Sequence, residues 1–261
     1  MTACTPMGRT VALVNQKGGV GKTTVTLGLA SAAQAAGHSV LVIDLDPQGA
    51  SSWVLGADPA TAEESTAEVI GKGSVGGAVL ESGWGEGVDL IPASGRLQVK
   101  EHSGSKDAAL RLRGALEGIA EEYDAVLIDC PPSLGNLTTN GLTAADHAVI
   151  IVEPAAFGLR GIGAVADVVD HVWDTYNPEL ELAGVIVNKV PAISLEAERQ
   201  YDELARIVGK RAIWQPAIPQ RVLVNQAIAA RRPIHSYGSR AADLVDAYDR
   251  LWAKLRRVAR G

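Results

Sequence analysis

A cluster of small and basic residues near the start of the chain has the composition of a phosphate-binding loop. The run is Lys17-Gly18-Gly19-Val20-Gly21-Lys22-Thr23-Thr24. Glycines allow several backbone N–H groups to point toward one anion, and a helix N-terminus beyond them adds partial positive charge. We therefore expect residues 17–24 to bind ATP and Mg²⁺, with Lys22 on the β and γ phosphates and the Thr23 hydroxyl on the metal.

The loop departs in one place from the usual pattern G-x-x-x-x-G-K-[ST]. Counting back from Gly21, the first glycine of that pattern would fall on Gln16. A second lysine, Lys17, stands directly after it. The loop therefore carries two lysines where the general pattern requires one.

Three carboxylates follow apolar runs that have the character of buried strands. One run ends at Asp44, and Asp46 lies two residues further along, on the same side of an extended chain. A second run ends at Asp129. Phosphoryl transfer requires Mg²⁺ and an oriented nucleophile, and ligands of parallel sheets bind at the carboxyl ends of the strands. The three carboxylates are therefore candidates for holding the metal and the attacking water.

The elements that must position these groups are apolar strands alternating with helices. The predicted strands are 11–15, 40–44, 88–92, 125–129, 148–153, 182–190 and 212–218, and the predicted helices are 25–36, 108–122, 162–173, 195–208 and 239–260. Strands that are apolar along their whole length are covered on both faces. We therefore expect an α/β fold with a doubly wound, mostly parallel sheet of the P-loop NTPase type. It would form a single domain over residues 9–261 after a leader at 1–8, with a glycine-rich loop at 71–87.

Charge is distributed unevenly along the chain. Residues 206–261 hold twelve Lys or Arg and three Asp, a net charge of +9, whereas residues 1–205 carry −15. This asymmetry indicates a polyanionic partner for one face. The alternative is a solvated basic face whose charge is offset by acids folded nearby.

The remaining composition favours a cytoplasmic protein. Two cysteines, Cys4 and Cys130, form neither a disulfide framework nor a zinc cluster, which fits a reducing compartment. No apolar run approaches the roughly 20 residues that span a bilayer. Residues 1–8 lack the apolar segment of a secretory signal.

The loop and its flanking motifs resemble the deviant Walker A ATPases of the ParA/MinD superfamily from about residue 9 onward. The resemblance rests on the segments Asn15-Gln16-Lys17, Asp44-Leu45-Asp46-Pro47-Gln48-Gly49, Asp129-Cys130-Pro131-Pro132-Ser133 and Pro233-Ile234. It implies that Lys17 crosses an ATP-dependent homodimer interface to the partner's phosphates. It also implies that Asp46 positions the attacking water, that Asp44 and Asp129 lie near the Mg²⁺, and that Asn188 and Pro219 lie beside the base.

Within that superfamily the motifs are most similar to ParA of the short, Soj-like form. The resemblance implies a slow ATPase whose ATP dimer binds double-stranded DNA without sequence preference, on the nucleoid, and is released when a ParB-like partner stimulates hydrolysis. Basic residues would contact DNA phosphates. The candidates are Arg221, Arg231, Arg232, Arg240, Arg256, Arg257 and Arg260.

Three other readings fit parts of the sequence. A MinD-like membrane switch would use a terminal amphipathic basic helix, for which Trp252, Leu255 and Ala259 form a weak apolar stripe. That stripe also fits packing against the body of the domain, so a membrane role is the less favoured reading. An iron-protein-like electron carrier needs two cluster cysteines, and the spacing of Cys4 and Cys130 argues against it. A metabolic P-loop kinase or synthetase is the fourth class.

Overall fold

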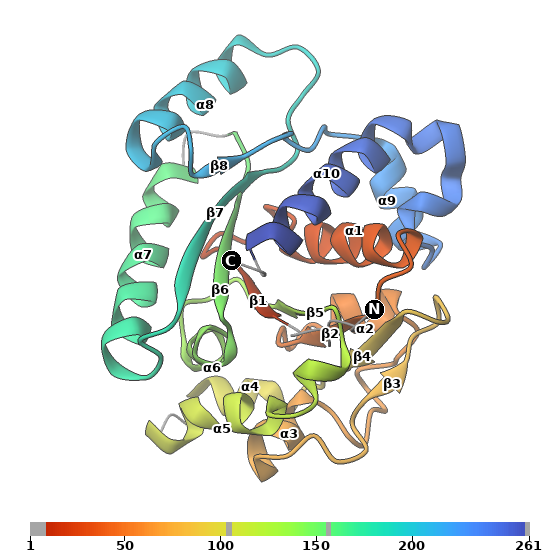
Figure 1. Ribbon diagram of the computed structural model, residues 1–261, viewed down its shortest axis with the longest axis vertical. Helices are drawn as coiled ribbons and strands as arrows, with labels where there is room; N and C mark the ends of the chain where they lie inside the picture. The colour runs from red at the N-terminus through yellow and green to blue at the C-terminus, as the bar shows by residue number, and fades with distance from the viewer. Residues whose placement is uncertain (1–8, 103–105, 155–157, 259–261) are drawn as a thin grey trace, which may run out of the picture.

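One central sheet organises the part of the chain that the computed structural model describes, residues 9–102, 106–154 and 158–258. Within these residues eight strands pair in the order β3-β4-β2-β5-β1-β6-β7-β8 (Figure 1). They are β1 (Arg9–Val14), β2 (Val40–Asp44), β3 (Leu80–Glu81), β4 (Val88–Ile91), β5 (Ala125–Asp129), β6 (His147–Val152), β7 (Glu181–Val187) and β8 (Ile213–Trp214). The β3–β4 pair is antiparallel, and the other pairs are parallel. The prediction of a doubly wound, mostly parallel sheet is confirmed.

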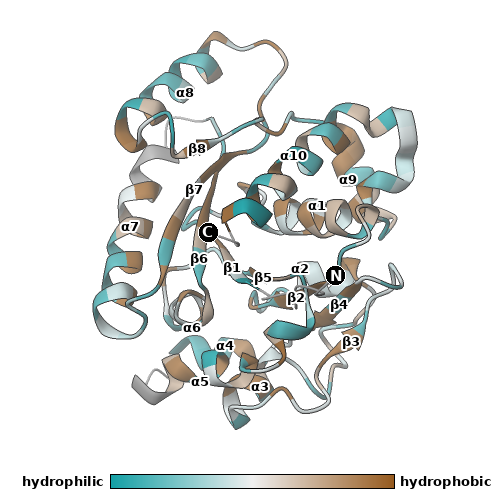
Figure 2. Ribbon diagram, in the orientation of Figure 1, coloured by the Kyte–Doolittle hydropathy of each residue, from teal (hydrophilic) through white to brown (hydrophobic). Residues whose placement is uncertain are grey.

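The central strands are apolar because both of their faces are covered. Every residue of β2, β5 and β6 is buried. Figure 2 shows hydrophobic residues concentrated along the central strands and hydrophilic ones on outer helices such as α8 (Leu195–Val208). Branched aliphatic side chains suit this pleated, fully buried position.

Helices cover the sheet in two layers. One face packs against α1 (Lys22–Ala35), α2 (Ala50–Val54), α9 (Val222–Ala229), the 3-10 segment η2 (Ile234–Ala241) and α10 (Ala242–Val258). The other face packs against α3 (Thr66–Lys72), α4 (Leu97–His102), α5 (Lys106–Leu116), α6 (Asn136–Ala144), α7 (Gly158–Thr175) and α8, and a short 3-10 turn, η1 (Ala120–Glu122), precedes β5. Figure 1 shows α9 and α10 beside α1, so the basic C-terminal segment lies on the same face as the helix that follows the glycine loop.

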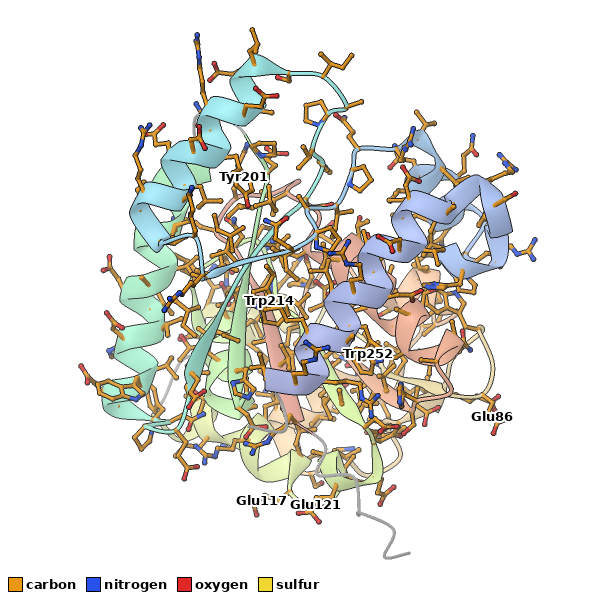
Figure 3. The ribbon with its side chains drawn as sticks, turned by 45° about the horizontal axis from the view of Figure 1, so that its top comes forward. Glu86, Glu117, Glu121, Tyr201, Trp214 and Trp252 are labelled. Carbon is orange, nitrogen blue, oxygen red and sulfur yellow. The ribbon has the colours of Figure 1, made fainter. Side chains whose placement is uncertain are left out.

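The terminal helix α10 is held by its apolar face against α1. Trp252, labelled in Figure 3, is 3% exposed and donates its indole N–H to His38 at 3.1 Å. Leu255 is also buried. The apolar stripe of the terminal helix is therefore used in packing within this domain. Ala259 and Arg260 lie outside the described residues, as do the leader 1–8 and Cys4.

A chain of hydrogen bonds through a serine, a histidine and an aspartate connects elements of the same layer, and its role is structural. The Ser31 hydroxyl lies 2.6 Å from Nδ1 of His235, whose Nε2 lies 2.9 Å from the Asp249 carboxylate. Ser31 is 1% exposed, so its oxygen cannot meet a substrate. The chain of hydrogen bonds instead ties α1, η2 and α10 together.

The structure differs from the sequence prediction mainly at short elements. The helices α2, α3, α4, α6 and α9 were not predicted, and the expected loop at 71–87 contains strand β3. The expected helix 239–260 begins at Ala242 because η2 precedes it, with Gly238 in a non-helical conformation. No helix in the described ranges is both long and apolar enough to cross a membrane.

A glycine in α1 permits the close approach of α10 and gives a test of this packing. A Cβ at Gly28 would lie 2.1 Å from the Tyr248 ring. Gly28→Ala is expected to lower the free energy of unfolding by about 1–3 kcal/mol through overpacking. At Gly163 of α7 a Cβ would meet nothing within 4 Å, so Gly163→Ala should instead stabilise by about 0.5–1 kcal/mol. Urea unfolding of both variants is the measurement, and equal stability of the two would contradict the packing argument.

Candidate functional site

The glycine loop connects β1 to α1 in the conformation that its glycines permit. Gly19 and Gly21 have φ angles of 83° and 91°. A Cβ at Gly21 would lie 2.3 Å from Nδ2 of Asn188, so only a residue without a side chain fits at this position. The predicted strand–glycine loop–helix arrangement is present.

Two asparagines hold the loop to neighbouring strand ends. The Asn15 side chain donates to the Ile151 carbonyl at 2.5 Å and accepts from the Lys17 backbone N–H at 2.7 Å. The Asn188 amide donates to the Val20 carbonyl at 2.9 Å. Asn188 is thus a support of the loop in this structure, and its predicted contact with a base stays a prediction. Pro219 lies in an adjoining segment, which pairs with residue 190.

A cavity of about 470 Å³ opens in front of the loop. Its walls combine loop residues with side chains from the segment after β2 and with one residue of α9. They include Gly18, Gly19, Gly21, Lys22, Thr23, Thr24, Asp46, Trp53, Pro132 and Ile228. The structure therefore brings Lys22, Thr23 and Asp46 to one cavity, as the sequence predicts.

Two carboxylates face each other behind this cavity because β2 and β5 are paired in register. Asp44 and Asp129 are direct neighbours across the two strands, and both are fully buried. Burial, followed by the charge of Asp129, raises the pKa of Asp44 to about 8. Burial likewise raises the pKa of Asp129 to about 6, against hydrogen bonds from Ser51 and Thr23. Such a pair favours a neighbouring cation.

The short helix α2 supplies hydroxyl donors to both carboxylates. Ser51 donates to Oδ2 of Asp129 at 2.7 Å. Ser52 donates to Oδ2 of Asp44 through its hydroxyl at 2.7 Å and its backbone N–H at 2.8 Å. The other oxygen of Asp44 accepts the Asp46 backbone N–H at 3.1 Å. Both oxygens of Asp44 are thus engaged within the protein, and its predicted place near the metal stays a prediction.

The residues present fit a nucleotide with a divalent cation. The Thr23 hydroxyl lies 2.7 Å from Oδ2 of Asp129. The second oxygen of Asp129, Oδ1, is buried without a hydrogen-bond partner among the described residues. Burial lowers the pKa of Lys22, against the attraction of Asp129. An orphaned carboxylate oxygen beside a threonine hydroxyl is the donor set that Mg²⁺ prefers.

Asp46 differs from the two buried carboxylates because it borders the cavity. Its Oδ1 accepts the Gln48 backbone N–H at 2.9 Å, which fixes the side chain in a turn. This position agrees with the water-orienting role that the resemblance implies, and that role stays a prediction.

The additional lysine of the loop is held within its own subunit. Lys17 forms an ion pair with Glu153, which follows β6. A third lysine, Lys189, donates to the Gly19 carbonyl. Neither Glu153 nor Lys189 carries a local signal for these contacts, because each contact joins segments more than a hundred residues apart.

The basic candidates fall into two groups at opposite ends of α10, which is about 25 Å long at 1.5 Å per residue. Arg221, Arg231, Arg232 and Arg240 are exposed on or beside α9 and η2, whereas Arg256 and Arg257 lie in the last turn of α10. Arg221 is paired with Asp243. Among the described residues, neither Arg232 nor Arg240 forms an ion pair.

The glycine loop lies between a buried strand and a helix and faces carboxylates at strand ends. This arrangement defines the class of P-loop nucleotide-binding proteins. The family model described as an AAA domain matches residues 8–182. The structure of cobyrinic acid a,c-diamide synthase from Mycobacterium smegmatis with a bound ATP analogue and magnesium has a TM-score of 0.82 and 28% identity, covering 97% of this chain and 96% of that one.

Two curated relatives define the family more closely. Sporulation initiation inhibitor protein Soj of Bacillus subtilis is 32% identical over 237 residues, which are 90% of this chain and 93% of Soj. Chromosome partitioning protein ParA of Caulobacter vibrioides is 35% identical over 239 residues, which are 90% of this chain and 89% of that protein. The chain belongs to the ParA/MinD family of P-loop ATPases.

The support of Asp44 by α2 can be tested by removing one hydroxyl. Ser52 donates to Asp44 and accepts the Ala93 backbone N–H at 2.8 Å, all in the buried interior. Ser52→Ala is expected to cost about 1–3 kcal/mol for each group left unpaired. Ser236→Ala, at an exposed serine that also donates one hydrogen bond, should change stability by less than about 0.5 kcal/mol. Chemical denaturation measures both, and a neutral Ser52→Ala would refute the support.

Proposed function

We propose that this chain is an ATP-dependent switch ATPase that partitions DNA or positions cargo on the nucleoid. Its ATP-bound homodimer would bind double-stranded DNA without sequence preference. A ParB-like partner would stimulate an otherwise slow hydrolysis and so release the dimer. Membership of the ParA/MinD family supports the ATPase, and relatives named for chromosome partitioning support the process.

The cavity residues would each perform one part of hydrolysis. The loop N–H groups and Lys22 would hold the phosphates, and Thr23 with Asp129 would hold Mg²⁺, directly or through water. When bound, the metal supplies charge neutralisation at the phosphoryl oxygens. Asp46 would accept a hydrogen bond from the attacking water and orient it. Ser51 keeps Asp129 in place.

Lys17 would make the switch depend on a second subunit. Its side chain is 37% exposed and is held by Glu153 in this structure. Breaking that pair would free the ammonium to reach the phosphates bound by a partner subunit. There it would add positive charge where negative charge develops.

One observation carries the DNA-binding part of the proposal. Ile228 of α9 lines the same cavity as Lys22 and Asp46. The helix that the basic residues flank therefore contributes to the wall of the nucleotide site. Arginines in this position can contact phosphates without reading bases, which gives affinity without sequence preference.

The alternative of a MinD-like membrane switch has less support. Its amphipathic terminal helix would need a free apolar face, whereas Trp252 and Leu255 are buried against the domain. Flotation with liposomes and ATP would separate the two readings. The likeness to a synthase of known structure keeps a metabolic reaction as a further alternative, for which ATP use would depend on a small substrate and not on DNA.

Asp46→Ala tests the proposed hydrolysis. The variant should lose DNA-stimulated ATP hydrolysis by about 10²-fold or more, since the water is no longer oriented, and should retain ATP-dependent dimerisation. Asp58→Ala is a matched control, because Asp58 also accepts an N–H two residues on, from Ala60 at 2.9 Å, outside the cavity. Phosphate release and analytical ultracentrifugation measure both properties. Normal hydrolysis by Asp46→Ala would overturn its assignment.

Arginine substitutions on the two sides of the molecule test the DNA surface. Arg232→Ala and Arg240→Ala should each weaken ATP-dependent DNA binding and reduce the slope of log K against log salt by about 1. Arg206→Ala removes another exposed arginine, from α8 on the opposite face of the sheet, and should change neither quantity. Fluorescence anisotropy with a random duplex is the measurement. Binding that needs no ATP, or that is flat in salt, would contradict the proposal.

A further inference from the structure

The five-residue helix α2 is fixed on one side by the carboxylates of the nucleotide site. Ser51 and Ser52 donate to Asp129 and Asp44, respectively. The turn that leads into α2 is closed by the Gly49 N–H, which donates to the Asp46 carbonyl at 2.8 Å. All three carboxylate residues of the site therefore contact α2 or the turn before it. A change in the site, such as filling by phosphates and a cation, therefore acts on groups that hold this helix.

The next residue of α2 points the other way, toward the basic surface. Trp53 lines the cavity and is 39% exposed. The guanidinium carbon of Arg231 lies 4.1 Å from the centre of the Trp53 ring, a cation–π contact. Trp53 thus touches the nucleotide cavity and one of the proposed DNA-binding arginines at once.

The backbone of Arg231 is held in a conformation that side chains seldom adopt. Its φ angle is 52°, in the left-handed region where non-glycine residues are uncommon. The Arg231 carbonyl accepts the Trp84 indole N–H at 3.1 Å, and its N–H donates to the Ile228 carbonyl at 3.0 Å. The arginine is therefore anchored at its backbone, and its side chain follows the ring of Trp53.

We propose that α2 couples the nucleotide cavity to the DNA-binding surface through the contact between Trp53 and Arg231, with Trp53 as a positioning residue. This inference rests on the proposed function, whose regulation it specifies. A stacked guanidinium keeps its edge N–H groups free for a phosphate, so the ring sets the direction in which Arg231 presents them. Occupation of the cavity shifts α2 and its ring, and DNA affinity changes with it. By linkage, DNA must change the affinity for ATP by the same factor.

The test is the ratio of DNA affinities measured with ATP and with ADP. Trp53→Ala should lower this ratio at least about fivefold, the lower end of ordinary allosteric couplings. Trp53→Phe retains an aromatic face and should keep most of the ratio. Trp173→Ala removes another exposed tryptophan, on α7 across the sheet, and should leave the ratio unchanged. An unchanged ratio in Trp53→Ala would overturn the inference.

A second measurement does not involve DNA and separates the inference from the proposed function. Arg231→Ala should change the affinity for a fluorescent ATP analogue in the wild-type background and have no effect in the Trp53→Ala background. Trp53→Leu with Arg231→Gln, which likewise removes the aromatic face and the cation, gives the same cycle if an alanine variant does not fold. If the wild type binds no DNA with ATP, the proposed function is overturned, and this cycle alone decides the coupling. Independent effects of the two substitutions would then overturn the coupling as well.

Discussion

The in-register pairing of two buried carboxylates is the constraint on which the site depends. Asp44 and Asp129 end neighbouring parallel strands and face each other in the interior. Burying charged groups is costly unless hydrogen bonds and opposite charges compensate them. The hydroxyls of Ser51, Ser52 and Thr23 surround the pair for this reason. The same donors fix the position of α2 and of the glycine loop, so the geometry of the cavity follows from the strand register.

The strands and the chemical residues could be predicted from sequence because their signals are local. Strands β2 and β5 are apolar up to the aspartate that ends each of them, and their bounds match the prediction. The contacts that complete the site are not local, since Lys17 meets Glu153 and Asn188 meets Val20 across most of the chain. Helix α6 was missed because its Asn, Thr and Gly residues favour helices weakly, and tertiary packing stabilises it instead.

The structure shows which charges of the basic C-terminal segment are paired. All three acids of residues 206–258 are engaged within that segment: Asp243 with Arg221, Asp246 with Arg250, and Asp249 with His235. These pairs account only in part for the alternative of a basic face whose charge is offset by acids folded nearby. They leave the arginines that flank η2 outside these ion pairs. Among the described residues, unpaired positive charge therefore remains both beside α9, next to the cavity, and in the last turns of α10.

A switch requires an element whose position depends on what it touches, and α2 has that property. Isolated helices of five residues are unstable, because nucleation costs more than so few hydrogen bonds return. The position of α2 therefore depends on its contacts, which include those of buried Val54 with the core, of Ser51 and Ser52 with the carboxylates, and of Trp53 with Arg231. A long helix in the same place would be held by its own hydrogen bonds and would respond less to either side. Because α2 is short and lies between the two surfaces, it is suited to carry a free-energy change from one surface to the other.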